Sequence, residues 1–103
     1  MNYSWSKKEK EVARKAFDLA NENKLKEIIG AIKTFKLETW QDLAALTQFV
    51  KQKEKETDSS FDYRYSILII SFANFIRQGL ITVEDLEGFN QDKIEKIEEI
   101  LKL

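Results

Sequence analysis

The chain has 103 residues, with 17 Lys and Arg against 18 Asp and Glu, and it contains no His, Cys or Pro. This length predicts a single domain, residues 1–103, with a core of modest size. Without His and Cys there is no imidazole base, thiolate nucleophile, disulfide or ordinary zinc ligand set. The near-neutral charge argues against binding to nucleic acid or membranes through bulk charge. The composition favours a protein that contacts other proteins over an enzyme.

The N-terminus carries no apolar stretch of signal-peptide length. The densest apolar stretch, Ile67 to Ile76, is interrupted by Ser71 and Asn74 and is too short to span a bilayer. We therefore expect a soluble cytoplasmic protein without membrane insertion.

The first predicted helix begins after Ser6, which forms a capping-box pattern with Glu9. Apolar residues then recur every three or four positions: Val12, Ala13, Ala16, Phe17, Ala20, Leu25, Ile28, Ile29, Ile32 and Phe35. A helix of about 30 residues is about 45 Å long, whereas a compact domain of this size has a radius of gyration of about 13 Å. The helix would extend beyond its own domain with an uncovered apolar stripe. A second copy of the chain would cover that stripe, so we predict a homodimer.

The second predicted helix begins after Thr39, which pairs with Asp42 in another capping pattern. Its apolar residues extend to Val50 and are followed by a solvated run of alternating charge at 51–56. We expect it to end at a loop, residues 58–60. Residues 1–58 or so would form extended dimerisation helices, and residues 59–103 or so a helical head.

The head is predicted to contain three helices, which makes the fold all-α. Residues 61–78 favour a buried helix over a strand because of their length and the following Gly79, with Asp62 as a candidate cap. Thr82 caps a short helix that stops near Gly88, and Asn90 caps the last one.

No motif in the sequence predicts catalysis. In the absence of His and Cys, only carboxylates, Lys or Tyr could act as general acids or bases. The sequence contains no phosphate-binding loop and no calcium loop. We therefore predict no enzymatic activity, no metal and no cofactor. Aromatic residues near helix starts or in polar stretches point instead to a protein interface, with core packing as the alternative: Trp5, Trp40, Phe49, Phe61, Tyr63 and Tyr65.

A small DNA-binding regulator is an alternative, because helices flanking the glycine turns imitate a helix-turn-helix. The last helix offers Lys93, Lys96 and Lys102, but four acidic residues are interspersed with them. That balance would repel phosphate, so protein binding is favoured over nucleic acid.

The sequence resembles the fluorescence recovery protein family of cyanobacteria across nearly its whole length. The matching motifs are Trp5-Ser6 with Phe17 twelve residues after the tryptophan, Leu43, Leu46, Phe49, Asp62-x-Arg64-x-Ser66, Phe72-Ala73, Gly79, Glu84-x-Leu86 and Asp92-Lys93. The resemblance implies an all-α homodimer with an extended helix pair and a small head. It also implies binding to the light-activated orange carotenoid protein, a faster return of that partner to its resting state and an end to quenching at the phycobilisome. The regulator would bind one partner conformation preferentially.

The resemblance implies dimer contacts at Leu37 and Leu43 and a partner contact at Lys96. Ile70 occupies another head position of the family, which it matches only in being apolar. Together with two aromatic residues of the second helix, the predicted partner-binding set is Trp40, Phe49, Ile70 and Lys96. The dimer interface is predicted at Leu37 and Leu43.

The sequence departs from the family at the patch on the second helix. The family has a Trp, a His-Asp pair and an Arg where this chain has Ala44, Thr47-Gln48 and Glu54. The change from Arg to Glu54 reverses a charge that steers or pairs with a partner. A homodimer of the same type that binds a different protein is therefore the first alternative.

Overall fold

The computed structural model describes residues 3–103, and no β-strand occurs within that range. Its elements are α1 (Lys7–Ile32), α2 (Trp40–Ser60), α3 (Leu68–Arg77), a short 3₁₀ helix η1 (Val83–Leu86) and α4 (Gln91–Leu101). The all-α prediction is confirmed.

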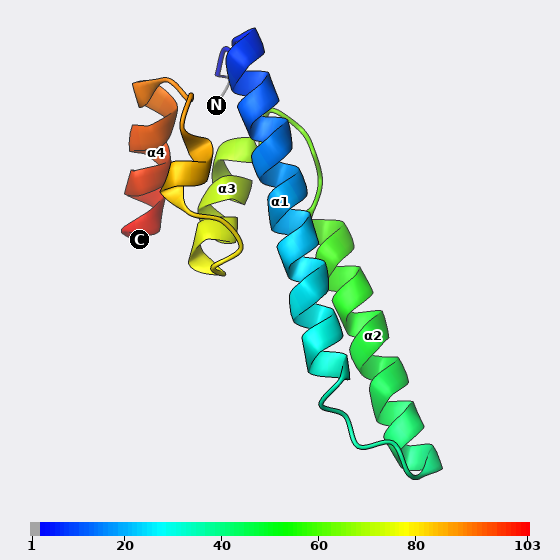
Figure 1. Cartoon of the computed structure of the whole chain (residues 1–103). Helices are drawn as coiled ribbons and strands as arrows, with labels where there is room; N and C mark the ends of the chain where they lie inside the picture. Colours follow the sequence, from blue (N-terminus) through cyan, green and yellow to red (C-terminus); the bar gives the residue numbers. More distant parts are fainter. Residues whose placement is uncertain (1–2) are drawn as a thin grey trace.

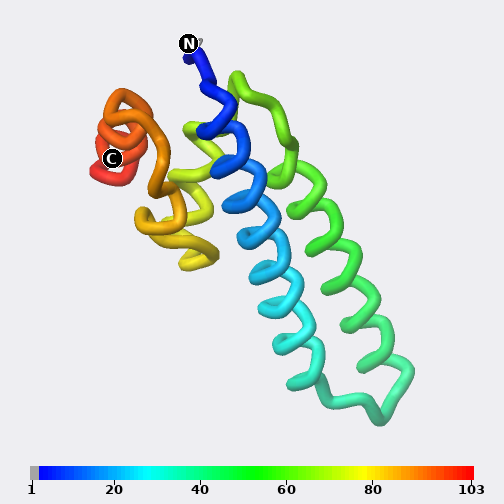
Figure 2. The backbone as a smooth tube through the Cα atoms, turned by 45° about the horizontal axis from the view of Figure 1, so that its top comes forward, coloured from blue at the N-terminus to red at the C-terminus, as the bar shows by residue number. Residues whose placement is uncertain are grey.

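The helices form two parts, which we call the arm and the head (Figure 1). The arm is the C-terminal half of α1 together with α2, which run side by side in opposite directions and extend beyond the rest of the chain (Figure 2). The head contains α3, η1 and α4, packed against the N-terminal half of α1. The chain measures 53 × 27 × 23 Å and its radius of gyration is 16.5 Å, above the value of about 13 Å for a compact domain. The predicted overhang of the first helix is confirmed.

The core lies entirely in the head and the adjoining half of α1. Small residues of α1, Ala13, Ala16 and Ala20, are buried. The Phe17 ring forms edge-to-face pairs with Tyr63 at 4.9 Å and Phe75 at 5.7 Å between ring centroids. Between residues 21 and 67 no side chain is fully buried. The arm therefore lacks a core of its own, although an amphipathic helix pair ordinarily gains its stability by burying an apolar stripe.

The predicted capping boxes are present at the starts of α1 and α2. The N–H of Glu9 donates to the Ser6 hydroxyl at 3.1 Å and the N–H of Ser6 donates to the Glu9 carboxylate at 3.0 Å. Thr39 and Asp42 are paired in the same way. The two helices therefore begin where the sequence predicts, because each cap satisfies N–H groups that the helix leaves free.

Two predicted boundaries are wrong. Residues 58–60 are not a loop, because α2 continues to Ser60 and the Ser59 hydroxyl donates to the carbonyls of Lys55 and Glu56. The third helix begins at Leu68, so residues 61–67 are not helical.

The segment 61–67 begins with aromatic and charged residues that alternate from Phe61 to Tyr65, the pattern of an extended stretch, and ends in a turn at residues 65–67. Phe61 packs on Phe17 at 5.5 Å and Tyr63 packs on the same ring, so both aromatic side chains reach α1. Asp62 and Arg64 form an ion pair at 2.7 Å. Asp62 is therefore not the cap of α3, and the two charged residues, which a helix would direct to different faces, lie together.

Candidate protein-binding surfaces

The tip of the arm exposes three large apolar side chains. Leu37, in the turn after α1, is 50% exposed, and Trp40 and Leu43 at the start of α2 are 85% and 44% exposed. All three line one hollow of about 240 Å³. The structure therefore brings the predicted partner residue Trp40 beside both predicted dimer residues. Exposed apolar side chains gathered in this way are typical of a protein contact.

Phe49, the second aromatic residue predicted to bind a partner, has a different environment. Its ring packs on Phe35 at 5.0 Å between centroids, and the Lys53 ammonium lies 5.5 Å from its centroid. The side chain is half-buried and connects α2 to the segment after α1. Phe49 thus contributes to the arm itself, and its role toward a partner stays a prediction.

An open groove of about 620 Å³ runs between α1 and α2, and we call it the arm groove. Its apolar lining consists of Leu25, Ile28, Ile29, Ile32 and Val50. Four carboxylates, two lysines and two uncharged polar residues complete the lining: Asp18, Glu22, Glu54, Asp58, Lys24, Lys53, Asn21 and Thr57. The apolar residues of α1 can be recognised from the helical periodicity of the sequence. The groove also requires residues of α2, and no local sequence pattern predicts how the two helices align.

The four positions at which the resemblance implies a departure from the family's patch are all exposed on α2. They are Ala44, Thr47, Gln48 and Glu54. The Thr47 hydroxyl donates to the carbonyl of Leu43 within the helix at 2.9 Å, and Glu54 lines the arm groove. Successive intervals of three, four and seven residues separate Trp40, Leu43, Thr47 and Glu54. These intervals match the helical repeat and place the four residues along one side of α2.

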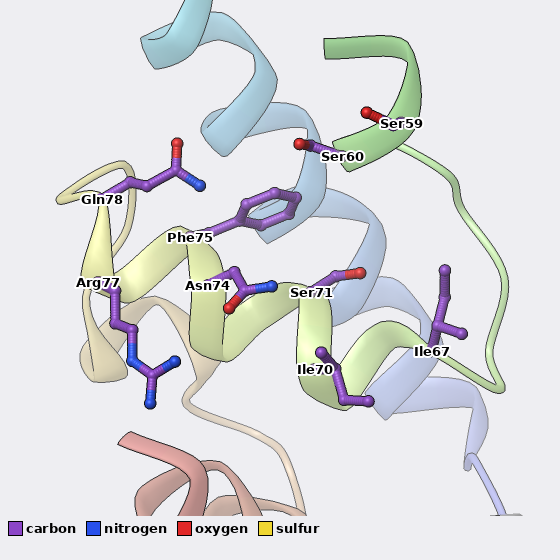
Figure 3. Close-up of a pocket in the computed structure, with 9 residues that line it drawn as sticks. All are labelled: Ser59, Ser60, Ile67, Ile70, Ser71, Asn74, Phe75, Arg77 and Gln78. Atoms are coloured by element: carbon purple, nitrogen blue, oxygen red, sulfur yellow. The ribbon is translucent and has the colours of Figure 1, made fainter. Parts of the chain in front are cut away.

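The head carries a separate cleft of about 480 Å³ between the end of α2 and α3 (Figure 3). Ile70, a predicted partner-binding residue, lines this cleft and is 55% exposed. The other lining residues are mostly polar: Ser59, Ser60, Ile67, Ser71, Asn74, Phe75, Arg77 and Gln78. The structure thus places Ile70 at an accessible position in the head, apart from the arm tip.

The last helix presents Lys96 to solvent but not Lys93. Lys96 pairs with Glu99 at 3.4 Å on the surface of α4. Lys93 is only 1% exposed and pairs with Glu9 of α1 at 3.0 Å. With Lys93 buried, α4 lacks one of the three lysines that a DNA-recognition helix would use, which weighs against the DNA-binding alternative.

Burial raises the pKa of Glu9, but hydrogen bonds from the N–H groups of Asn90 and Ser6, together with Lys93, outweigh that effect and lower the pKa to about 2. Burial raises the pKa of Tyr63 to about 12. Neither group is therefore placed to exchange a proton near neutral pH.

Neither a metal site nor a membrane-spanning helix is found in the part of the chain that the structure describes. Residues 3–103 contain no group of three or more Asp, Glu, His or Cys side chains arranged to hold a metal ion. Among those same residues, no helix combines the length and apolar character needed to cross a membrane.

Comparison with known proteins identifies the family. Residues 5–101 match the family model described as photoprotection regulator fluorescence recovery protein. The fluorescence recovery protein of Synechocystis sp. is 30% identical over 101 residues, which covers 96% of this chain and 93% of that protein.

Solved structures agree in fold over almost the entire chain. The fluorescence recovery protein of Fremyella diplosiphon matches with a TM-score of 0.90 and 34% identity, covering 97% of this chain and 100% of the other. The structure of the Synechocystis protein matches with the same TM-score and 28% identity over the same shares of both chains. The chain therefore belongs to the fluorescence recovery protein family of photoprotection regulators.

Proposed function

We propose that the protein is a non-enzymatic cytoplasmic regulator that binds photoactivated orange carotenoid protein as a homodimer and speeds its return to the resting state. The family match over residues 5–101 supports this role. The single structural observation that carries it is the arm, in which no residue of α2 is buried while Leu37, Trp40 and Leu43 are exposed.

Acceleration requires differential binding. A protein that binds two conformations of a partner equally leaves the equilibrium between them unchanged. A regulator speeds the conversion only if it binds the transition state between the two conformations more tightly than the starting conformation. The same rule governs catalysis. The regulator therefore needs a shaped, exposed surface, and no chemically reactive side chain.

A second surface in the head supports the same role. Ile70 and Lys96 are both accessible, on α3 and α4 respectively. Together with Trp40 at the arm tip they give the dimer more than one place to contact a large partner. Contacts at separate places raise affinity when one partner can engage them simultaneously.

The test is the dark relaxation of photoactivated orange carotenoid protein, followed by absorbance with and without the regulator. We expect faster relaxation with increasing regulator and joint elution from a sizing column. A relaxation rate that stays constant, with no joint elution, would overturn the proposed partner.

A homodimer of this type with a different protein partner is the second candidate. The exposed residues Ala44, Thr47, Gln48 and Glu54 favour it, because they give this side of α2 a different shape and charge from the patch that the resemblance implies. Capture of another protein by the wild-type regulator, lost in Trp40→Ala, together with no effect on carotenoid-protein relaxation, would select this candidate.

A further inference from the structure

The cleft between the end of α2 and α3, which we call the head cleft, has an apolar side and a polar side (Figure 3). Ile70, Asn74 and Arg77 are separated by four and three residues, which places them along one side of α3. All three are exposed. Ile67 and Phe75 add further apolar lining. An apolar side chain that entered the cleft would be removed from water, which is favourable.

Arg77 is the one charged residue among the described residues that line the head cleft. Its guanidinium donates to the carbonyl of Ile100 at the end of α4, and within residues 3–103 it forms no ion pair. A carbonyl has no formal charge, and a guanidinium has five N–H donors. Arg77 therefore has a positive charge and donors that a carboxylate of a partner could satisfy.

The remainder of the head is acidic. Residues 78–103 contain seven Asp and Glu against three Lys, and Lys93 is buried in its pair with Glu9. None of these seven carboxylates lines the head cleft. Charge complementarity therefore favours an acidic group in the cleft. Because the surrounding carboxylates would repel an extended acidic surface, the cleft fits a single Asp or Glu beside an apolar side chain.

Side-chain amides add hydrogen-bond donors to the lining of the cleft. The amide oxygen of Gln78 accepts from the Lys24 ammonium at 3.2 Å, so its NH₂ group is left to donate to another acceptor. Asn74 contributes a second amide to the lining. A carboxylate accepts hydrogen bonds from amides as well as from a guanidinium. These donors favour the same occupant as the charge of Arg77.

The second copy of the chain is predicted to cover other surfaces. The predicted dimer residues Leu37 and Leu43 and the apolar stripe of α1 belong to the arm, and no described residue of the arm groove or of the hollow at the arm tip lines the head cleft. Both carboxylates of the tip are already engaged, Glu38 with Lys36 at 3.4 Å and Asp42 with the N–H groups of its helix cap. A partner protein is therefore the occupant that the charges favour.

We propose that the head cleft binds a segment of the partner protein in which one apolar side chain lies against Ile67 and Ile70 and one Asp or Glu pairs with Arg77. The inference rests on the proposed protein-binding function and specifies the chemistry of the partner at the head. Ile70 and Arg77 are seven residues apart, which is about 10 Å along a helix. The partner segment must present its two groups at about the same separation, as residues i and i+7 of a helix do. Arg77 then selects partners, because a basic side chain in that position would be repelled.

The test uses three labelled helical peptides of about 20 residues. Each has a leucine and, seven residues later, Glu, Gln or Lys, and the three are otherwise identical. Binding is measured by fluorescence anisotropy against the full-length wild-type protein, Arg77→Gln, Ile70→Ala and the control Lys102→Gln. Arg77→Gln removes the charge but retains an amide donor for the carbonyl of Ile100. Lys102→Gln removes the same charge at the end of α4, outside the cleft.

We expect the wild-type protein to bind the Glu peptide about tenfold more tightly than the Gln peptide at low salt, and the Lys peptide most weakly. Arg77→Gln should remove the difference between the Glu and Gln peptides, and Lys102→Gln should retain it. Ile70→Ala should weaken the binding of all three peptides, because each loses the same apolar contact. In NMR spectra of the wild-type protein, the Glu peptide should shift the side-chain amide signals of Asn74 and Gln78.

Several results would overturn the proposal. They are equal affinity for the Glu and Gln peptides, equal effects of Arg77→Gln and Lys102→Gln, unchanged binding in Ile70→Ala, and NMR shifts confined to the arm. If Arg77 served only to connect α3 to α4, Arg77→Gln would lower the free energy of unfolding and leave the peptide preference unchanged. That outcome would also overturn the proposal.

A second copy in the head cleft would give another result. Arg77→Gln and Ile70→Ala would then change the dimer mass measured by light scattering without changing the peptide preference, which again overturns the proposal. The relaxation assay is independent of these readouts. A wild-type protein that prefers the Glu peptide but leaves the carotenoid protein unaffected would refute the proposed partner and retain the specificity of the head cleft for an acidic group.

Discussion

Lys93 and Glu9 form an ion pair at 3.0 Å, and each side chain is only 1% exposed. The Lys93 ammonium also donates to the carbonyl of Ser4 at 2.7 Å and lies 5.0 Å from the Trp5 ring centroid. The Glu9 carboxylate accepts the N–H of Asn90 at 2.9 Å. These contacts connect the segment before α1, the first turn of α1 and the start of α4. A buried pair satisfied on both sides holds three segments of the chain in one arrangement.

Removal of one partner should leave the other charge buried and uncompensated. We expect Lys93→Met to lower the free energy of unfolding by about 3–5 kcal/mol, measured by urea denaturation. The double variant Lys93→Met with Glu9→Leu should recover much of that loss, because apolar residues of similar volume often replace a buried pair without cost. A loss below about 1 kcal/mol in the single variant would contradict the assigned role.

The same pair makes stability depend on acid. The pKa of Glu9 is about 2 in the folded protein against an ordinary value of 4.5. A depressed pKa contributes stability that is complete above pH 4.5 and is lost as the pH falls from there toward 2. We expect this contribution to be about 3 kcal/mol. The difference in unfolding free energy between wild type and Glu9→Gln should shrink across this window, and a constant difference would contradict the shift.

Replacing each of two glycines by alanine should change the stability of the protein in opposite directions. Gly88 has φ +113°, and a Cβ there would lie 2.8 Å from Cγ2 of Val12. We expect Gly88→Ala to destabilise the protein by about 1–3 kcal/mol through strain and overpacking. Gly30 lies within α1 with no atom within 4 Å of such a Cβ, so Gly30→Ala should stabilise by about 0.5–1 kcal/mol. Thermal melting of both variants distinguishes these effects, and equal shifts would contradict the account.

Leu43 should be more important for association than for the fold of one chain. Its side chain is 44% exposed in the monomer, so Leu43→Glu should retain the helical circular dichroism spectrum. In the proposed dimer the same substitution buries an unpaired charge, and we expect light scattering to show the monomer mass. Leu103→Glu, at a position 96% exposed outside the arm, is the control and should keep the dimer mass. An unchanged mass for Leu43→Glu would remove this residue from the interface.

Substitution of Trp40 should weaken partner binding without lowering the stability of the fold. It is 85% exposed, so Trp40→Ala should change the free energy of unfolding by less than about 0.5 kcal/mol. Its affinity for the partner should nevertheless fall, because exposed tryptophans at interfaces carry much of the binding energy. Phe75→Ala is the contrasting core variant and should cost about 3–5 kcal/mol. Unchanged partner affinity in Trp40→Ala would exclude this residue from the binding surface.

Residues 61–65 explain why the predicted start of the third helix is wrong. The alternation Phe61-Asp62-Tyr63-Arg64-Tyr65 has a period of two, which is typical of an extended segment. The helix α3 contains only the apolar run that follows, Leu68–Arg77, so the predicted helix over residues 61–78 begins too early in the chain. Of the predicted interface aromatics, Trp5, Phe61 and Tyr63 pack against the core instead.

The all-α class, the starts of α1 and α2 and the overhang of the first helix could be predicted from the sequence alone. These follow from hydrogen bonds and periodicities between residues that are close along the chain. Only the tertiary structure decided that Lys93 is buried against Glu9, 84 positions away in the sequence, and that Glu54 lines an apolar groove. Those environments arise where separate helices meet, and a charged residue has the same local pattern whether its surroundings are water or another helix.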